Sequence, residues 1–88
     1  MTNYYVNMID RFMSGWGPAK DGRSIYCIRC ATEKQAKSAY LAAKIRKEMV
    51  GVRMSQSPRA VNKGDVRKIV DFYTLGPIWK YHISKEIQ

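Results

Sequence analysis

The chain has 88 residues, of which 45% are hydrophobic, 26% charged and 11% aromatic. This length leaves room for a single small domain (residues 1–88), and the aromatic content excludes a disordered tail. Sixteen Lys and Arg against seven Asp and Glu leave a net charge of +9. Such an excess favours an acidic partner and excludes a protein that imitates the phosphate charge of DNA.

Residues 3–12 alternate in the manner of a strand, with Tyr4, Val6, Met8 and Phe12 on one side. The start carries no basic region followed by an apolar run, and no segment is long and apolar enough to span a bilayer. We therefore expect a soluble chain that stays in the cytoplasm and makes no contact with a membrane.

Residues 13–22 carry three glycines, a proline and an Asp-Gly pair, which predicts a long hairpin connection. Within it, Gly15 and Gly17 frame Trp16, and Pro18 follows. The indole of Trp16 either stacks on a base or fills a pocket of a partner protein, or it folds back and seals a thin core.

Residues 23–31 predict a second strand that places Tyr26, Ile28 and Cys30 on one face and Ile25, Cys27 and Arg29 on the other. Positions i and i+3 of a strand point to opposite faces and lie about 10 Å apart. The Cys-x-x-Cys pair therefore predicts neither a disulfide nor a shared metal, and besides the cysteines the chain offers only His82 as a zinc ligand. Reduced thiols and no metal or cofactor are expected.

Residues 32–49 predict a helix, because Thr32 and Gln35 have the spacing of a capping box. On a helical wheel an alanine arc faces the sheet, and lysines occupy the opposite side. Leu41 and Ile45 lie outside the alanine arc. They either wrap the edge of the core or mark a contact with another chain, such as a second copy in a homodimer.

Val50, Val52 and Met54 alternate inward in a predicted third strand, and residues 57–65 are polar, basic and rich in turn formers. An extended return up to Tyr73 follows, then a turn and a last packed segment. A right-handed crossover predicts an α+β two-layer β-β-α-β domain, with an antiparallel sheet of order 2-1-3 and the helix on one face. Aromatic residues of the C-terminal segment are expected to close the core, at an edge or on the second face.

Several segments together resemble a widespread family of small phage-encoded proteins. They are the Asp10-Arg11-Phe12-Met13-Ser14-Gly15-Trp16-Gly17 run, the strand ending in Cys30 with Thr32 and Gln35-Ala36 after it, Arg46-Lys47-Glu48-Met49 leading into Val52, and Gly76-Pro77-x-Trp79. The resemblance implies a phage or prophage source, and hence a host-cell cytoplasm, and transfers no catalytic residues. The chain departs from the family pattern in being basic along the helix and after Pro58.

The surplus cations are the main candidates for binding nucleic acid or an acidic host protein or nucleoprotein: Lys34, Lys37, Lys44, Lys47, Arg53, Arg59, Lys63, Arg67 and Lys68. The alternative is a solvated face that only aids solubility. Among the C-terminal aromatics, Tyr73 is a second candidate for stacking or partner contact, whereas Phe72 and Trp79 are expected to complete the core. Tyr81 and Lys80 belong to the same segment.

Catalysis is not expected, because His82 has no carboxylate or nucleophile paired with it locally and the aspartates are scattered. We therefore expect a non-enzymatic phage accessory protein that inhibits a host defence nucleoprotein, in the manner of an anti-CRISPR protein. Two alternatives stay open. One is a sponge for a nucleotide signal, with Trp16 or Tyr73 stacked on the base; the other is a homo-oligomeric adaptor that uses Leu41 and Ile45.

Overall fold

The computed structural model describes residues 3–76 and residue 79. Their elements, in chain order, are β1 (Tyr4–Asp10), the 3₁₀ helix η1 (Gly17–Ala19), β2 (Ser24–Cys30), α1 (Glu33–Ile45), β3 (Met49–Ser55), β4 (Val66–Asp71) and the 3₁₀ helix η2 (Phe72–Thr74). None of the helices in these residues is long and apolar enough to cross a membrane.

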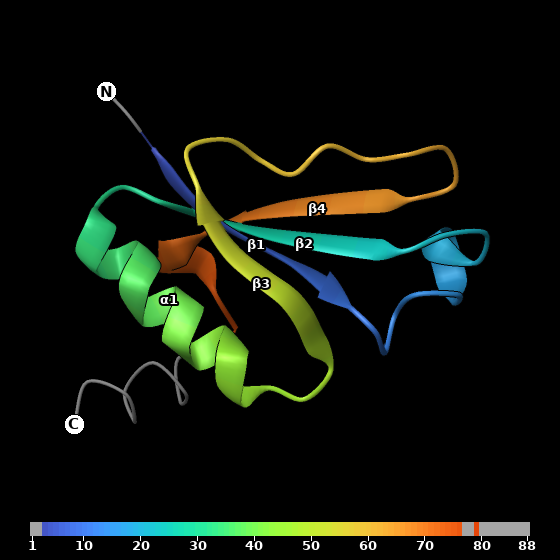
Figure 1. Cartoon of the computed structure of the whole chain (residues 1–88), viewed down its shortest axis with the longest axis horizontal. Helices are drawn as coiled ribbons and strands as arrows, with labels where there is room; N and C mark the ends of the chain where they lie inside the picture. The colour runs from blue at the N-terminus through green and yellow to red at the C-terminus, as the bar shows by residue number, and fades with distance from the viewer. Residues whose placement is uncertain (1–2, 77–78, 80–88) are drawn as a thin grey trace.

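The four strands form one mixed sheet in the order β3-β1-β2-β4 (Figure 1). β1 pairs antiparallel with β2 and with β3, as expected, and α1 lies on one face of the sheet. The prediction of a purely antiparallel sheet of three strands is wrong, because β4 joins the sheet in parallel to β2. The physical reason is the connection after β3, which runs back along the length of the sheet, so that β4 starts beside the start of β2 (Figure 1).

The helix begins as predicted and ends earlier. The Thr32 hydroxyl accepts from the backbone N–H of Gln35 at 3.1 Å, and the Gln35 side chain accepts from the N–H of Ala31 at 3.0 Å. Arg46 then adopts an extended conformation (φ −80°, ψ 116°), which ends α1 at Ile45 instead of near Met49. Met49 is the first residue of β3.

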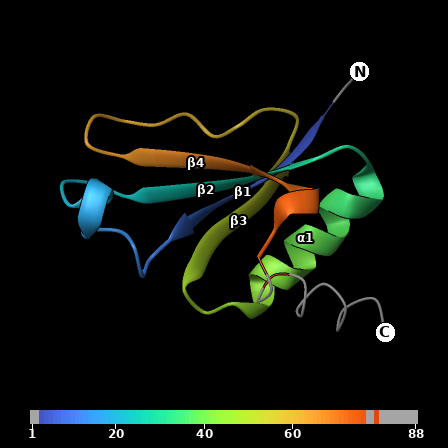
Figure 2. The same cartoon turned by 180° about the vertical axis from the view of Figure 1, so that it is seen from behind.

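The main core lies between α1 and the sheet. The four alanines of the predicted arc are fully buried: Ala36, Ala39, Ala42 and Ala43. They pack against a layer of side chains from the sheet: Val6, Met8, Ile28 and Cys30. Small alanine side chains let the helix approach closely. Leu75 and Trp79 are buried in the same core, and Phe72 packs against it, so the aromatic C-terminal segment closes the core on the helix side (Figure 2). Tyr81 and the rest of the predicted last segment lie outside the described residues.

A β-bulge at Gly51 changes the alternation of β3. Asn7 pairs with Arg53 and Ile9 with Val50, so one residue of β1 faces two residues of β3. Gly51 has φ +62°, which favours glycine. As a result Met49 and Val52 contact the core, whereas Val50 pairs with Ile9 on the opposite face, against the prediction that Val50, Val52 and Met54 all point inward. Met54 pairs with Val6 and lies on the helix side, where it is 42% exposed.

The second face of the sheet is covered by the connection from β3 to β4. Ile25 and Cys27 are fully buried there, although they lie outside the main core. Cys30 belongs to the main core, so the two thiols of the Cys-x-x-Cys pair lie on opposite faces of β2 and both are free, as the strand geometry predicts. The expectation that the C-terminal tail covers this second face is wrong for Leu75 and Trp79.

Candidate nucleic-acid interface

The nine predicted cations do not lie on one side of the molecule. Lys34, Lys37 and Lys44 are exposed on α1, and Lys47 is exposed in the turn after it. Arg53, Arg59 and Arg67 lie instead on the face opposite α1, as their contacts below establish. Lys63 is exposed in the turn before β4, and Lys68 pairs in register with Tyr26, whose ring packs against the helix-side core. The structure therefore divides most of the cations into two groups. The helix group is Lys34, Lys37, Lys44 and Lys47, and the sheet group is Arg53, Arg59 and Arg67. Lys63 and Lys68 belong to neither group.

Within the part of the chain that the structure describes, three ion pairs hold other arginines. Arg23 Nη2 lies 2.9 Å from Asp65 Oδ2, Arg29 Nε lies 2.6 Å from Asp71 Oδ1, and Arg46 pairs with Glu48. The hydrogen bond from Arg23 lowers the pKa of Asp65 to about 2, and Arg29 lowers the pKa of Asp71 in the same way. None of the nine candidate cations takes part in an ion pair with another described residue.

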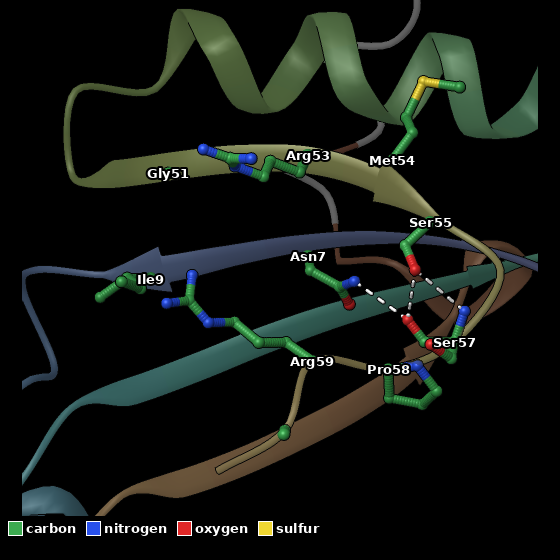
Figure 3. Close-up of a pocket in the computed structure, with 10 residues that line it drawn as sticks. Asn7, Ile9, Gly51, Arg53, Met54, Ser55, Ser57, Pro58 and Arg59 are labelled. Carbon is green, nitrogen blue, oxygen red and sulfur yellow. Dashed lines mark hydrogen bonds between the residues drawn. The ribbon is translucent and has the colours of Figure 1, made fainter. Parts of the chain in front are cut away.

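A cavity of about 730 Å³ lies on the face opposite α1, between β3 and the start of the connection to β4 (Figure 3). Arg53 from β3 and Arg59 from the connection line it together with Asn7, Ser55 and Ser57. In the close-up both guanidinium groups lie near Gly51, and Arg59 Nη1 is 3.7 Å from the position that a Cβ of Gly51 would occupy. We call this site the arginine cavity. The side chains that the structure describes around it include two cations and no carboxylate.

Residues 56–60 are tied down across the sheet, which fixes where Arg59 projects. Asn7 Nδ2 donates to the carbonyl oxygen of Ser57 at 3.1 Å, and Arg67 Nη1 donates to the carbonyl oxygen of Arg59 at 3.0 Å. Burial beneath this segment raises the pKa of the Cys27 thiol, although the backbone of Arg59 partly opposes the shift. Asn7 is 94% buried, and its Oδ1 has no hydrogen-bond partner within the described part of the chain.

The segment between β1 and β2 forms a second exposed surface. We call residues 11–23 the Trp16 loop. Trp16 is 71% exposed and Phe12 is 76% exposed, so Trp16 does not fold back onto the core. Phe12 was expected to point to the same side as Tyr4, Val6 and Met8, and this is wrong because β1 ends at Asp10. The Asp10 carboxylate accepts from the backbone N–H groups of Phe12 and Met13, which turns the chain out of the sheet.

Sequence reasoning missed Arg11, Phe12 and Lys20 as surface groups near Trp16. A signal was present in Asp10, which interrupts the apolar side of the strand, because an aspartate at a strand end commonly begins an Asx-type turn by accepting from backbone N–H groups two and three residues later. The strand pattern concealed it, since Phe12 continues the alternation of β1 by one more step.

The remaining candidates lie apart from both surfaces. Tyr73 is 72% exposed, and its hydroxyl accepts from Gln35 Nε2 at 2.6 Å near the start of α1. Trp16 lies instead beside the start of β2, so the two rings do not form one stacking site. Leu41 and Ile45 are 38% and 41% exposed and are not among the described residues that form the core cluster. Residues 3–76 with 79 include no cluster of His, Cys, Asp or Glu able to hold a metal ion, and Lys80 and His82 lie outside these residues.

Comparisons of this chain with protein-family models, with curated proteins and with solved structures found no match.

Proposed function

We propose that this protein binds nucleic acid without catalysing a reaction, and that the face opposite α1 makes the contact. The charge of +9 and the phage-like sequence segments favour a role as a small accessory protein that inhibits a host defence nucleoprotein, in the manner of an anti-CRISPR protein. In that role the protein competes for the nucleic acid on which the nucleoprotein acts.

The observation that carries the proposal is the arginine cavity. Arg53 and Arg59 line this one cavity from two different segments, with Arg59 Nη1 beside Gly51, and the described side chains lining the cavity carry no charge that would neutralise them. Guanidinium groups bind phosphate oxygens through paired N–H donors, so two of them in one cavity favour a phosphate group over a neutral ligand.

The surrounding charges extend this site. Arg67 lies on the same face, held to the carbonyl of Arg59, and Lys63 lies in the turn that leads into β4. Each phosphate that a cation neutralises releases counterions, so a surface of this kind binds nucleic acid with an affinity that falls steeply as salt rises. The contacts are to phosphates, and we expect little preference for base sequence.

A pair of matched double variants tests the proposal. Arg53→Gln with Arg59→Gln removes the charge of the arginine cavity, and Lys37→Gln with Lys44→Gln removes the same charge from the opposite side of the molecule. We expect the first pair to weaken binding to a labelled single-stranded oligonucleotide, measured by fluorescence anisotropy at several salt concentrations, and to reduce the salt slope by about two. The second pair should change both quantities much less.

Equal losses from both pairs, or no binding by the unaltered protein at low salt, would contradict the proposal. Mono- and cyclic nucleotides in a thermal-shift assay separate strand binding from a nucleotide sponge, because a tightly bound nucleotide raises Tm at concentrations well above its Kd. A large shift with a free nucleotide and weak binding to an oligonucleotide would favour the sponge.

The exposure of Leu41 and Ile45 favours one further candidate, a homo-oligomeric adaptor that joins copies through α1. Sedimentation of the unaltered protein and of Leu41→Lys tests it. A monomer in both cases would exclude the adaptor, whereas an oligomer that Leu41→Lys dissociates would support it.

A further inference from the structure

The Trp16 loop exposes three large apolar side chains within five consecutive residues. Phe12 is 76% exposed, Trp16 is 71% exposed and Met13 is 39% exposed. Trp79 is only 5% exposed by comparison, so the chain does bury an indole where its core needs one. Exposed apolar groups that gather at one place typically mark a binding surface.

This loop is held in one conformation before any partner binds. The Ser14 hydroxyl donates to the carbonyl oxygen of Asp10 at 2.7 Å and accepts from the N–H of Ser24 at 2.9 Å, which ties the loop to both strands of the hairpin. The N–H of Gly15 reaches the carbonyl oxygens of Ala19 and Gly22 at 3.0 and 3.1 Å. A rigid loop loses little conformational entropy when a ligand contacts it.

Two hollows flank the Trp16 indole. One, of about 510 Å³, is lined by Arg11, Phe12, Met13 and Trp16. The other, of about 420 Å³, lies between Trp16 and the ring of Tyr26, with Lys68 and Asp10 also lining it. Tyr26 is itself fixed, because its ring stacks on Trp79 with centroids 5.8 Å apart and planes at 13°.

The chemistry of these hollows matches an unpaired nucleobase. Each combines flat apolar surface with one cation, Arg11 in the first and Lys68 in the second. A base offers a flat ring for stacking, and the phosphate that it carries lies within reach of a flexible cation. The Asp10 carboxylate is already engaged by the backbone amides of Phe12 and Met13.

The Trp16 loop also lies next to the start of β4, where Lys63, Arg67 and Lys68 are close in the sequence. The N–H of Val66 donates to the carbonyl oxygen of Arg23 at 2.9 Å, and Arg23 Nη2 pairs with Asp65. The turn that carries Lys63 therefore packs against the loop, and Arg67 and Lys68 follow it in β4. Arg67 and Lys68 point to opposite faces of the sheet, so a strand of nucleic acid that runs from the arginine cavity to Trp16 passes around this end of the sheet, from Arg67 to Lys68.

From these observations, and resting on the proposed function, we propose that the protein prefers single-stranded nucleic acid and that Trp16 stacks on an unpaired base of the strand. In a duplex the bases are stacked on each other, so they are closed to the indole. The phosphates of the strand provide the affinity, and the stacked base provides the preference for a single strand.

The test compares the loss of affinity caused by removing the indole, the loss caused by removing the bases, and the loss when both are removed together. The probes are a labelled oligothymidylate, an abasic oligonucleotide of the same length, and the duplex with oligoadenylate, each measured with the unaltered protein, Trp16→Ala and Trp16→Phe. Loss of one stacked base should weaken binding about 5- to 150-fold. We expect that loss for Trp16→Ala with oligothymidylate and for the unaltered protein with the abasic strand, with no further loss when the two are combined. Trp16→Phe should keep most of the affinity.

Indole fluorescence gives a second readout, because Trp16 and Trp79 are the two tryptophans and only Trp16 is exposed. Oligothymidylate should quench the emission of the unaltered protein and leave that of Trp16→Phe nearly unchanged. Equal affinity of the unaltered protein for the normal and abasic strands overturns the stacking inference and leaves phosphate binding in place. Full affinity of Trp16→Ala for oligothymidylate also overturns it, and then the loop is a protein-binding surface. Failure to bind any of the three ligands overturns the proposed function itself.

Discussion

Asn7 Nδ2 donates to the carbonyl oxygen of Ser57 at 3.1 Å, which joins the middle of β1 to a segment fifty residues further along the chain. This bond crosses the face opposite α1 and holds the segment that carries Arg59. Asn7 is the one buried polar side chain within residues 3–76 and 79. Burying its amide costs free energy, which the hydrogen bond from Nδ2 partly offsets. We infer that Asn7 is a positioning residue for the arginine cavity.

Replacing Asn7 should therefore loosen this segment. We expect Asn7→Ala to lower the free energy of unfolding by about 1 kcal/mol, because the carbonyl of Ser57 loses the one of its two donors that reaches across the sheet and keeps only the Ser55 hydroxyl. The backbone amides of Ser57, Arg59 and Ala60 should exchange hydrogen faster, and oligonucleotide binding should weaken. Asn3→Ala, at an exposed position before β1, is the control and should match the unaltered protein. Unchanged exchange in Asn7→Ala would show that the segment is held by other contacts.

The Arg23–Asp65 pair predicts a pH dependence of stability. The pKa of Asp65 is lowered from 3.8 to about 2 in the folded state. A carboxyl with a lowered pKa in the folded state stabilises the fold above its unfolded value, and this contribution is lost as pH falls from 3.8 toward about 2. Urea unfolding between pH 2 and 6 should show this loss, and Asp65→Asn and Arg23→Gln should each reduce it. If both variants lost as much stability at low pH as the unaltered protein, the loss could not be assigned to the Arg23–Asp65 pair.

Gly22 should tolerate no side chain. A Cβ there would lie 2.3 Å from the carbonyl oxygen of Gly64, which is backbone and has little freedom to move. We expect Gly22→Ala to destabilise the protein by about 1–3 kcal/mol. Gly76→Ala is the matched control, since apart from its chain neighbours no described residue lies within 4 Å of its Cβ position. If both variants have the same Tm, the turn before β4 does not pack on the Trp16 loop as described.

The two tryptophans should differ sharply in their effect on stability. Trp79 is 5% exposed, its ring stacks on Tyr26, and the Arg46 guanidinium lies 4.5 Å from its centroid. We expect Trp79→Ala to cost about 3–5 kcal/mol in denaturant unfolding. Trp16→Ala should stay within about 0.5 kcal/mol of the unaltered protein, because an exposed ring contributes little to the core. A large cost for Trp16→Ala would mean that its ring packs on the domain.

The two cysteines should be unreactive in the folded protein. Burial raises the pKa of Cys30 to about 11 and also raises that of Cys27, so little thiolate is present at pH 8. A thiol reagent should label both residues in denaturant and neither in native buffer. Because the side chains point to opposite faces of β2, mild oxidation should give no bond between them. An intramolecular disulfide in the folded protein would refute the strand geometry.

Several elements were predictable because their signals are local. The Thr32 cap, the alanine arc and the alternation of residues 4–10 and 24–30 each depend on neighbours within a few positions. The same reasoning placed the two cysteines on opposite faces of one strand. Local periodicity determines which face of an element is apolar, and a short chain has few ways to cover that face.

The end of α1 and the direction of Phe12 were not predictable in this way. Residues 46–49 are good helix formers, yet Arg46 leaves the helix, packs on Trp79 and pairs with Glu48. Phe12 continues an alternating pattern, yet the Asp10 carboxylate turns the chain. In both cases a contact or turn outweighs a weak local preference.

The charge, the helix with its alanine face, and the hairpin of β1 and β2 follow from the residues alone. Long-range contacts set the parallel placement of β4, the burial of Cys27 beside the backbone of Arg59, and the placement of Arg53 and Arg59 in one cavity. These last features depend on contacts between segments far apart in the chain, whose pairing is set by the free energy of packing the whole domain and leaves no periodic trace in the residues themselves.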